Sequence, residues 1–282
     1  MTSEKFNLFA FTGKMKILHL SWIAFFITFV VWFNHAPLLM AIASSLGLTP
    51  SEIKTLLILN FALTIPARVV IGMLTDRFGP KIVYSSLLAI CSIPCFMFAL
   101  ADTFVQAAIA RFLLGFIGAG FVIGIRMVSE WFPANELGTA EGIYGGWGNF
   151  GSAAAAFTLP VIALWFGGDD GWRYAVGITG ILSLLFSFVY YFNVTDTPKG
   201  STYFKPKNIG AMEVTSKGDF YFLLIMKLPM YAALALLTWK LSPEGVSLLN
   251  ELTSILCYIG LALLFIYEVS HVWKVNKNIF TT

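Results

Sequence analysis

The sequence predicts an all-α protein that crosses a membrane many times, and three observations support this fold class. Hydrophobic residues make up 58% of the 282-residue chain, charged residues make up only 12%, and the mean hydropathy is +0.80. Soluble domains carry about a quarter charged residues. The apolar residues are gathered into eight segments, each close to the ~20 residues that a membrane-spanning helix needs. The composition therefore excludes an ordinary soluble domain.

The eight segments follow one another with mostly short connections. We expect them near residues 17–45, 54–74, 82–101, 104–128, 139–165, 173–193, 219–239 and 248–270. The first apolar run is too long for the core of a cleavable signal peptide, so we interpret it as the first membrane helix. Glycine, proline and charged residues occupy four of the connections and allow the chain to turn. These connections are 47–51, 76–81, 132–135 and 167–171.

The distribution of Lys and Arg predicts the orientation of the chain. With the N-terminus inside the cell, four basic residues lie at the outer ends of the spans and twelve at the inner ends. Cytoplasmic loops carry the excess of positive charge, so we expect both termini in the cytoplasm and the chain in the inner (plasma) membrane. The inner set is Lys5, Lys14, Lys16, Arg77, Lys81, Arg126, Lys199, Lys205, Lys207, Lys217, Lys274 and Lys277.

The spacing of the spans divides the chain into four regions. Six spans lie within residues 1–195, which we expect to form a six-helix bundle. A polar stretch at 196–218 is predicted to be a cytoplasmic linker. Residues 219–270 are predicted to form a hairpin of two additional transmembrane helices, and residues 271–282 a cytoplasmic tail.

Two polar features within the apolar spans point to an anion site. Four glycines surround Asn149 in the fifth span, and Gly145, Gly146 and Gly148 would expose helix backbone to a ligand or to a neighbouring helix. Arg68 lies in the second span with no carboxylate nearby in sequence. A guanidinium without a partner presents a planar fork of donors that suits an oxyanion. The pair suggests a small planar anion in the middle of the membrane.

Structural alternatives exist for both residues. An arginine at the centre of a membrane helix costs about 2.5–3.5 kcal/mol on insertion scales, so it needs compensation. A backbone carbonyl or Glu141 on another helix could supply that compensation. Asn149 could be a polar contact between two helices, because amides often serve this purpose in membranes.

The motifs resemble the nitrate/nitrite porter family of the major facilitator superfamily over about residues 15–200. The matching segments are 121–124, 129–133 and 140–151. The resemblance implies that Arg68 on the second helix and Asn149 on the fifth bind the substrate. It also implies that aromatic rings at Phe121 and Phe33 line the site.

The loop at 72–81 resembles the superfamily motif between the second and third helices. It carries Gly72, Asp76, Arg77, Gly79 and Lys81 at the expected places. Glycine permits close packing, and the charged residues can form a cytoplasmic network that breaks and re-forms as the transporter changes conformation. A solvated loop that obeys the positive-inside rule is the alternative.

Four more polar side chains lie in or beside the apolar spans. Arg111 and Arg126 are 15 residues apart, or roughly 22 Å along a helix, and therefore lie near opposite membrane faces. Glu130 follows Arg126 by one turn and can pair with it. Arg111 resembles a superfamily arginine tied to proton coupling, although an orienting structural role is equally open. His35 lies well inside the first apolar span and is a histidine that could titrate near neutral pH.

The resemblance implies membrane transport of nitrate and/or nitrite by alternating access. The six-helix bundle corresponds to the N-terminal half of such a transporter, and the two further helices to an insertion between halves. We expect a partial transporter, with the C-terminal half in the same or a second polypeptide. Proton symport and nitrate/nitrite exchange both stay open. The alternatives are transport of another small anion or solute, and a non-transporting scaffold or sensor.

Other classes find no support in the sequence. It contains no catalytic triad pattern, phosphate-binding loop or zinc-protease motif, so we expect neither an enzyme nor a cofactor. Cys91, Cys95 and Cys257 lie in apolar segments without His or carboxylate neighbours at ligand spacing, which predicts packing roles and no metal site. A net charge of +3 gives no sign of nucleic-acid binding.

Overall fold

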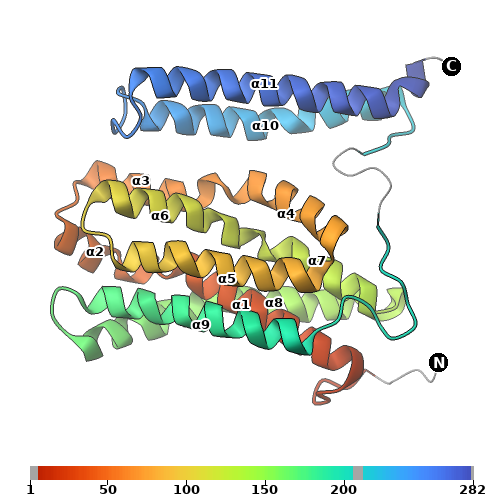
Figure 1. Cartoon of the computed structure of the whole chain (residues 1–282), viewed down its shortest axis with the longest axis horizontal. Coiled ribbons are helices and arrows are strands. Elements are labelled where there is room, and N and C mark those ends of the chain that lie inside the picture. The colour runs from red at the N-terminus through yellow and green to blue at the C-terminus, as the bar shows by residue number, and fades with distance from the viewer. Residues whose placement is uncertain (1–5, 206–211, 281–282) are drawn as a thin grey trace. The chain divides into compact units, whose positions relative to one another are not determined.

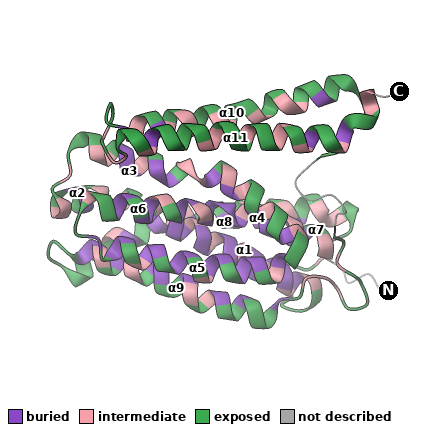
Figure 2. Cartoon of the chain, turned by 45° about the horizontal axis from the view of Figure 1, so that its top comes forward, coloured by how far each residue is buried: buried purple, intermediate pink, exposed green. Residues whose placement is uncertain are grey.

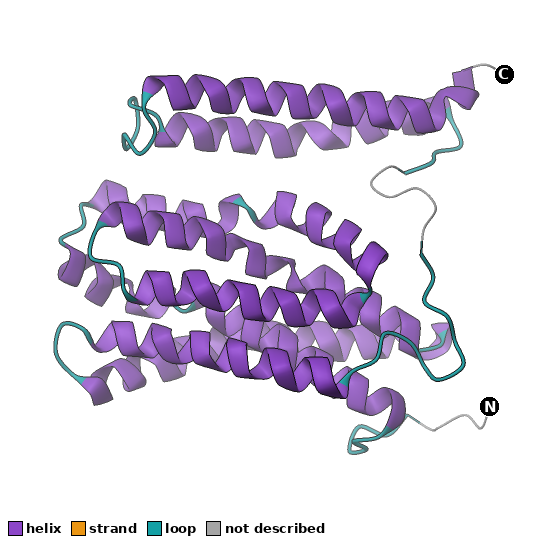
Figure 3. Cartoon of the chain, viewed as in Figure 1, coloured by secondary structure: helices purple, strands orange, loops and turns teal. Residues whose placement is uncertain are grey.

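The computed structural model describes residues 6–205 and 212–280, and within these ranges the regular structure is entirely helical (Figure 3). Eight helical segments of the described chain are long and apolar enough to cross a membrane, as predicted. Lys5, Lys207, the middle of the predicted linker at 206–211 and the end of the predicted tail at 281–282 lie outside the described residues. The chain forms two compact units, 1–205 and 206–282.

The first unit contains nine α-helices and two short 3₁₀ segments among its described residues (Figure 1). They are α1 (Gly13–Phe33), η1 (Ala36–Leu38), α2 (Leu39–Leu46), α3 (Pro50–Ala62), α4 (Thr64–Phe78), α5 (Pro80–Ala99), α6 (Phe104–Leu114), η2 (Gly115–Ala119), α7 (Gly120–Trp131), α8 (Ala134–Phe166) and α9 (Gly171–Asn193).

Three of the predicted continuous spans are interrupted. The first span is divided into α1, η1 and α2, and Pro37 lies in η1 at the break. The second is divided between α3 and α4, where Pro66 lacks the N–H that would bond to the carbonyl of Ala62. The fourth contains the 3₁₀ segment η2, which is rich in glycine. The break before α4 places Arg68 in that helix's first turns.

The core of the first unit lies between α1, α5, α8 and α9, where Figure 2 shows most of the buried surface on α1 and α5. Helices α1 and α8 run side by side (Figure 1). Their approach depends on Gly148, because a Cβ built there would lie 1.8 Å from Cδ1 of Phe25. No residue larger than glycine fits at this contact unless the Phe25 ring or one of the two helices shifts.

A buried polar cluster joins α6, the end of α1 and α3. Arg111 is fully buried on α6 and donates hydrogen bonds to the Asn34 side chain at 2.9 Å and the Trp32 carbonyl at 2.7 Å. It also donates to the side-chain oxygen of Asn60 on α3. These hydrogen bonds stabilise the buried charge through its two terminal nitrogens, while the Nε of Arg111 has no partner among the described residues. These contacts give Arg111 an orienting structural role.

The second unit is a helical hairpin made of α10 (Lys217–Leu241) and α11 (Glu251–Asn276), followed by η3 (Lys277–Phe280). Both helices are apolar and mostly exposed within the unit. Lys227 and Glu268 form an ion pair of 2.9 Å between them. Asn276 ties the end of α11 to the preceding chain by accepting from the Val214 N–H at 2.8 Å. The assignment of this hairpin as an insertion stays a prediction.

Candidate functional site

Arg68 lies on α4 as a partly buried cation that lacks a carboxylate partner. None of the ion pairs in the described ranges includes it, and its Nε is buried without a hydrogen-bond acceptor. The pairing with Glu141 that the sequence left open is therefore not present. The guanidinium carbon lies 5.6 Å from the centroid of the Phe121 ring on α7. This cation–π contact offsets part of the cost of the charge and leaves N–H donors for a ligand.

An aromatic row on α1 connects the two predicted site residues Phe121 and Phe33. Phe25, Phe29 and Phe33 follow one another at four-residue spacing, with ring centroids 4.8 Å and 5.6 Å apart. The ring of Phe25 also lies 5.6 Å from that of Phe121. The rings therefore form a continuous apolar row that ends beside Arg68. The spacing of Phe25, Phe29 and Phe33 is visible in the sequence, although only Phe33 and Phe121 were predicted as site residues.

The glycine-rich part of α8 has two different faces. Gly145 and Gly146 have no neighbouring atom within 4 Å of a Cβ position, so they face open space. Gly148 instead packs against α1. Asn149 is exposed, and its amide nitrogen donates to the Gly145 carbonyl at 2.7 Å. The second amide hydrogen of Asn149 has no protein acceptor.

The aromatic ring of Phe121 lies between the helices that carry Arg68 and Asn149. Its centroid is 6.5 Å from that of Tyr144, which is one residue before Gly145 on α8. Tyr144 is buried, and its hydroxyl donates to the Gly120 carbonyl at 2.9 Å, which ties α8 to α7. Tyr144 lies in the matching segment 140–151, but its sequence position alone did not predict this contact. Whether Arg68 and Asn149 bind one ligand together stays a prediction.

His35 lies apart from this row. It is 1% exposed, next to η1, and neither ring nitrogen has a hydrogen-bond partner. A side chain so enclosed has no visible route for protons. The geometry therefore gives no support to His35 as a proton carrier.

The predicted switch motif lies where α4 ends and α5 begins. Asp76 lies 3.9 Å from Arg126 on α7, and Arg126 also pairs with Glu130 at 2.9 Å, which confirms the pairing predicted from their spacing. Gly72 faces open space. Arg77 is exposed and covers the Phe78 ring.

Gly79 and Lys81 contact Asp196, which follows α9 and is distant from them only in sequence. The carboxylate of Asp196 accepts the Lys81 N–H at 2.7 Å and so satisfies a free donor in the first turn of α5. Gly79 has φ +88°, and its Cβ position lies 2.7 Å from this carboxylate. Any side chain at Gly79 would strain the backbone and displace Asp196.

The segment 195–205 continues across the same surface. Arg126 donates to the Tyr203 hydroxyl at 3.3 Å and to the Phe204 carbonyl at 2.9 Å. The Trp131 indole N–H donates to the Thr195 carbonyl at 3.1 Å. Burial raises the pKa of the Tyr203 phenol although the hydrogen bond from Arg126 acts against the rise. The phenol therefore keeps its proton near neutral pH.

Comparison with known proteins now identifies the fold family. Residues 21–272 match the family described as the Major Facilitator Superfamily. The chain belongs to the major facilitator superfamily. A bacterial homologue of the human lysosomal transporter Spinster, solved in an inward-facing and unoccupied conformation, has the same fold. It matches 79% of this chain and 51% of its own chain, with a TM-score of 0.59 and 18% identity.

Closer relatives within the superfamily are named nitrate transporters. The nitrate/nitrite transporter NrtP of Nostoc punctiforme is 48% identical over 279 residues, which are 98% of this chain and 56% of that protein. NrtP of Picosynechococcus is 45% identical over 299 residues, with the same coverage. The probable nitrate transporter NarT of Staphylococcus carnosus is 34% identical and matches 58% of this chain and 41% of its own. The chain spans about half the length of the first two relatives.

Proposed function

We propose that this chain forms the N-terminal half of a transporter that moves nitrate and/or nitrite by alternating access. The observation that carries the proposal is Arg68, a partly buried cation with free donors beside the Phe121 ring. The names of the relatives support the same substrates. The alternatives are another small planar anion, and a half-transporter that serves as a scaffold or sensor.

The chemistry of the site follows from the shape of its donors. Two parallel N–H groups of Arg68 would bind two oxygens of a planar anion, which a point charge cannot match. The Phe121 face would pack against the flat ligand, and the free amide hydrogen of Asn149 would bind a third oxygen. Gly145 and Gly146 contribute space and not donors, since their N–H groups lie inside α8 and are used in the helix.

The same chain would supply one of the charged networks that change during the conformational cycle of the complete transporter. The contacts among Asp76, Arg126 and Glu130 join the cytoplasmic ends of α4 and α7. Charged networks on a surface are individually weak, so they can break and re-form during each transport cycle. We propose that this network opens when the two halves of the complete transporter change their relative orientation.

The setting is a membrane, as the family and the eight apolar segments show. We propose the plasma membrane, with both termini in the cytoplasm. The excess of Lys and Arg at one set of helix ends supports this orientation. Labelling of single cysteines introduced into 242–248 and 197–201 would test it, because only the former should react from outside intact cells.

Uptake of labelled nitrate tests the proposed function. The chain is produced in cells without their own nitrate transport, alone and together with the part of the Nostoc protein that it does not match. We expect uptake from the pair, and loss of that uptake with Arg68→Lys at equal membrane levels. Uptake of another anion in a competition panel would reassign the substrate. A stable pair with no anion uptake at all would favour the scaffold or sensor.

A further inference from the structure

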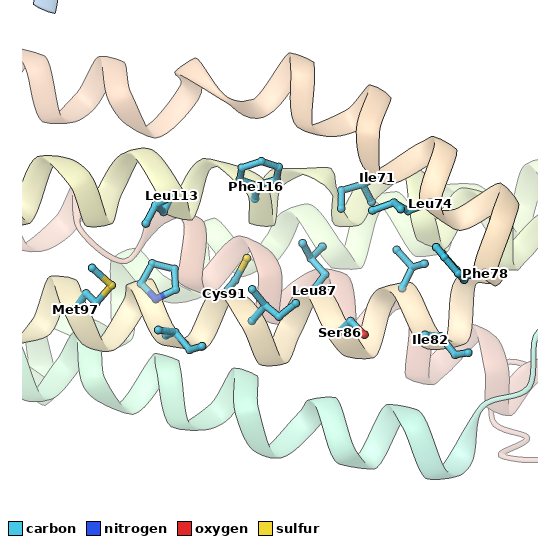
Figure 4. Close-up of a pocket in the computed structure, with 14 residues that line it drawn as sticks. Ile71, Leu74, Phe78, Ile82, Ser86, Leu87, Cys91, Met97, Leu113 and Phe116 are labelled. Carbon is cyan, nitrogen blue, oxygen red and sulfur yellow. The ribbon is translucent and has the colours of Figure 1, made fainter. Parts of the chain in front are cut away.

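An apolar groove runs along the first unit between α4 and α5 (Figure 4). Its volume of 540 Å³ lies within the range of about 300–1,000 Å³ that is typical of small-molecule sites. Its walls come from α4 through Leu74 and Phe78 and from α5 through Ile82 and Ile90. Leu113 of α6 lies at its base, and the neighbouring η2 contributes Phe116.

The shape of the groove suits an extended hydrocarbon chain. Its α5 wall extends from Ile82 to Met97, fifteen residues or about 22 Å of helix. The hydrocarbon core of a bilayer is about 30 Å thick, so the groove is longer than one leaflet is deep. Ser86 is the single residue with a polar side chain among those that line it. Such a surface offers dispersion contacts along its length and nearly no hydrogen bonds.

A positive charge marks one end of the groove. Arg77 is exposed, has no ion pair in the described ranges, and lies 5.3 Å from the centroid of the Phe78 ring, which lines the groove. Lys81 follows on the same loop, with its Nζ 4.6 Å from the Tyr191 ring. Asp76, the nearest acidic residue in sequence, faces Arg126 instead. The guanidinium of Arg77 is therefore free to bind a headgroup.

We infer that this groove is a binding site for an anionic phospholipid, with one acyl chain between α4 and α5 and the phosphate at Arg77. Basic residues between helices at the cytoplasmic side of a membrane bind anionic headgroups, and each contributes to affinity. The charge of Arg77 adjoins Phe78 at one end of the apolar groove, which is the order of headgroup and acyl chain that a phospholipid requires. This site is separate from Arg68 and does not depend on which anion is transported.

Native mass spectrometry of the full chain tests the inference. The protein is purified from nanodiscs of phosphatidylcholine and phosphatidylglycerol in equal amounts, and the retained lipids are counted. Arg77→Gln should lower the ratio of bound phosphatidylglycerol to phosphatidylcholine by about fivefold, as expected for loss of one basic residue near the headgroup. Lys54→Gln removes an exposed charge near the start of α3, at the other end of the span that α3 and α4 form, and should leave the ratio unchanged.

A second pair of variants tests the groove itself. Ile90 lines it and is 62% exposed, so Ile90→Trp fills the space from the membrane side. We expect loss of both retained lipids. Leu185→Trp adds the same ring to α9, where 60% of the leucine is exposed, and should retain them. Thermal unfolding in detergent checks that all four variants fold.

Three outcomes would overturn the inference. An unchanged lipid ratio in Arg77→Gln would show that the charge does not select the headgroup. Full lipid retention in Ile90→Trp would show only general contact between lipid and protein. Dimers that lose lipid on formation would identify a second copy of the chain as the occupant of the groove.

Discussion

The Tyr203 hydroxyl donates a hydrogen bond of 2.8 Å to the carbonyl of Thr75, across 128 residues of sequence. Thr75 lies in the last turn of α4, directly before Asp76 of the switch motif. Tyr203 also accepts from Arg126, whose guanidinium carbon lies 5.2 Å from its ring centroid. One phenol thus connects the segment after the six-helix bundle to both helices that carry the proposed switch network.

Removal of this hydroxyl should loosen the segment without unfolding the bundle. Tyr203→Phe keeps the ring against Arg126 but loses both hydrogen bonds. Since a typical hydrogen bond contributes about 0.5–1.5 kcal/mol net, hydrogen exchange of residues 197–205 should become severalfold faster. Tyr174→Phe is the control, because that tyrosine is exposed on α9 and its hydroxyl makes no hydrogen bond in the described ranges. Equal exchange in Tyr203→Phe and the wild type would refute the proposed tie.

The sequence predicted the spans well because a membrane imposes uniform physical demands on them. Long apolar stretches separated by turn residues leave few alternatives, and the breaks at Pro37 and Pro66 were visible as prolines. Ion pairs within one helix could also be predicted, because Arg126 and Glu130 are one turn apart. The spans were predicted from composition, and the Arg126–Glu130 pair was predicted from the periodicity of a helix.

The contacts of the segment 195–205 could not be predicted in this way. It has no periodicity, and Tyr203 meets Thr75 only because the ends of α4 and α9 lie at the same side of the bundle. The packing of Gly148 against Phe25 likewise depends on how two distant helices approach. The sequence suggested that Gly148 faces a ligand or a helix, and only the structure shows the helix.

Gly148 and Gly146 should respond in opposite ways to the same substitution. Gly148→Ala places a methyl group against Phe25 and should destabilise the chain by about 1–3 kcal/mol, as overpacking does. Gly146→Ala meets nothing within 4 Å and should be neutral or stabilising by up to about 1 kcal/mol, because alanine favours a helix. Thermal unfolding in detergent measures both. A neutral Gly148→Ala would mean that the Phe25 ring does not pack rigidly against α8 at this position.

The Asp196 carboxylate should make stability depend on pH in mildly acidic solution. Burial raises the pKa of this carboxyl, opposed by the Lys81 N–H and the charges of Lys81 and Lys205. Because the folded-state pKa lies above the unfolded value, the native state binds more protons between the two. The contribution of Asp196 to the free energy of unfolding should therefore fall as the pH rises from the unfolded-state pKa through the raised folded-state pKa.

The comparison with Asp196→Asn isolates this effect. The amide oxygen of Asn can still accept the Lys81 N–H, but it does not titrate. The unfolding temperature of the wild type, relative to that of Asp196→Asn, should decline as the pH rises above the ordinary carboxyl pKa, and it should level off above the raised pKa of Asp196. A constant difference over this range would show that Asp196 does not have a raised pKa.

Arg68→Lys should separate geometry from charge at the proposed anion site. The variant keeps a cation but loses the planar fork, so nitrate uptake by the complete transporter should fall to near background. Asn149→Ala removes one donor to the anion and should raise the KM by roughly 10- to 100-fold, from the 1.5–3 kcal/mol of a hydrogen bond to a charged group. Both are measured as labelled-nitrate uptake over a range of concentrations, at matched surface expression.

Arg173→Lys supplies the structural control for this comparison. Arg173 donates to the carbonyls of Ala99 and Ala101 and pairs with Asp102 and Asp170, so its loss weakens loop contacts at the end of the bundle opposite the switch motif. We expect Arg173→Lys to lower the amount of folded protein while the KM for nitrate stays unchanged. Arg68→Lys should leave the amount unchanged and abolish uptake. If Arg68→Lys instead behaves like Arg173→Lys, with normal KM and less protein, Arg68 is a structural residue and the anion site lies elsewhere.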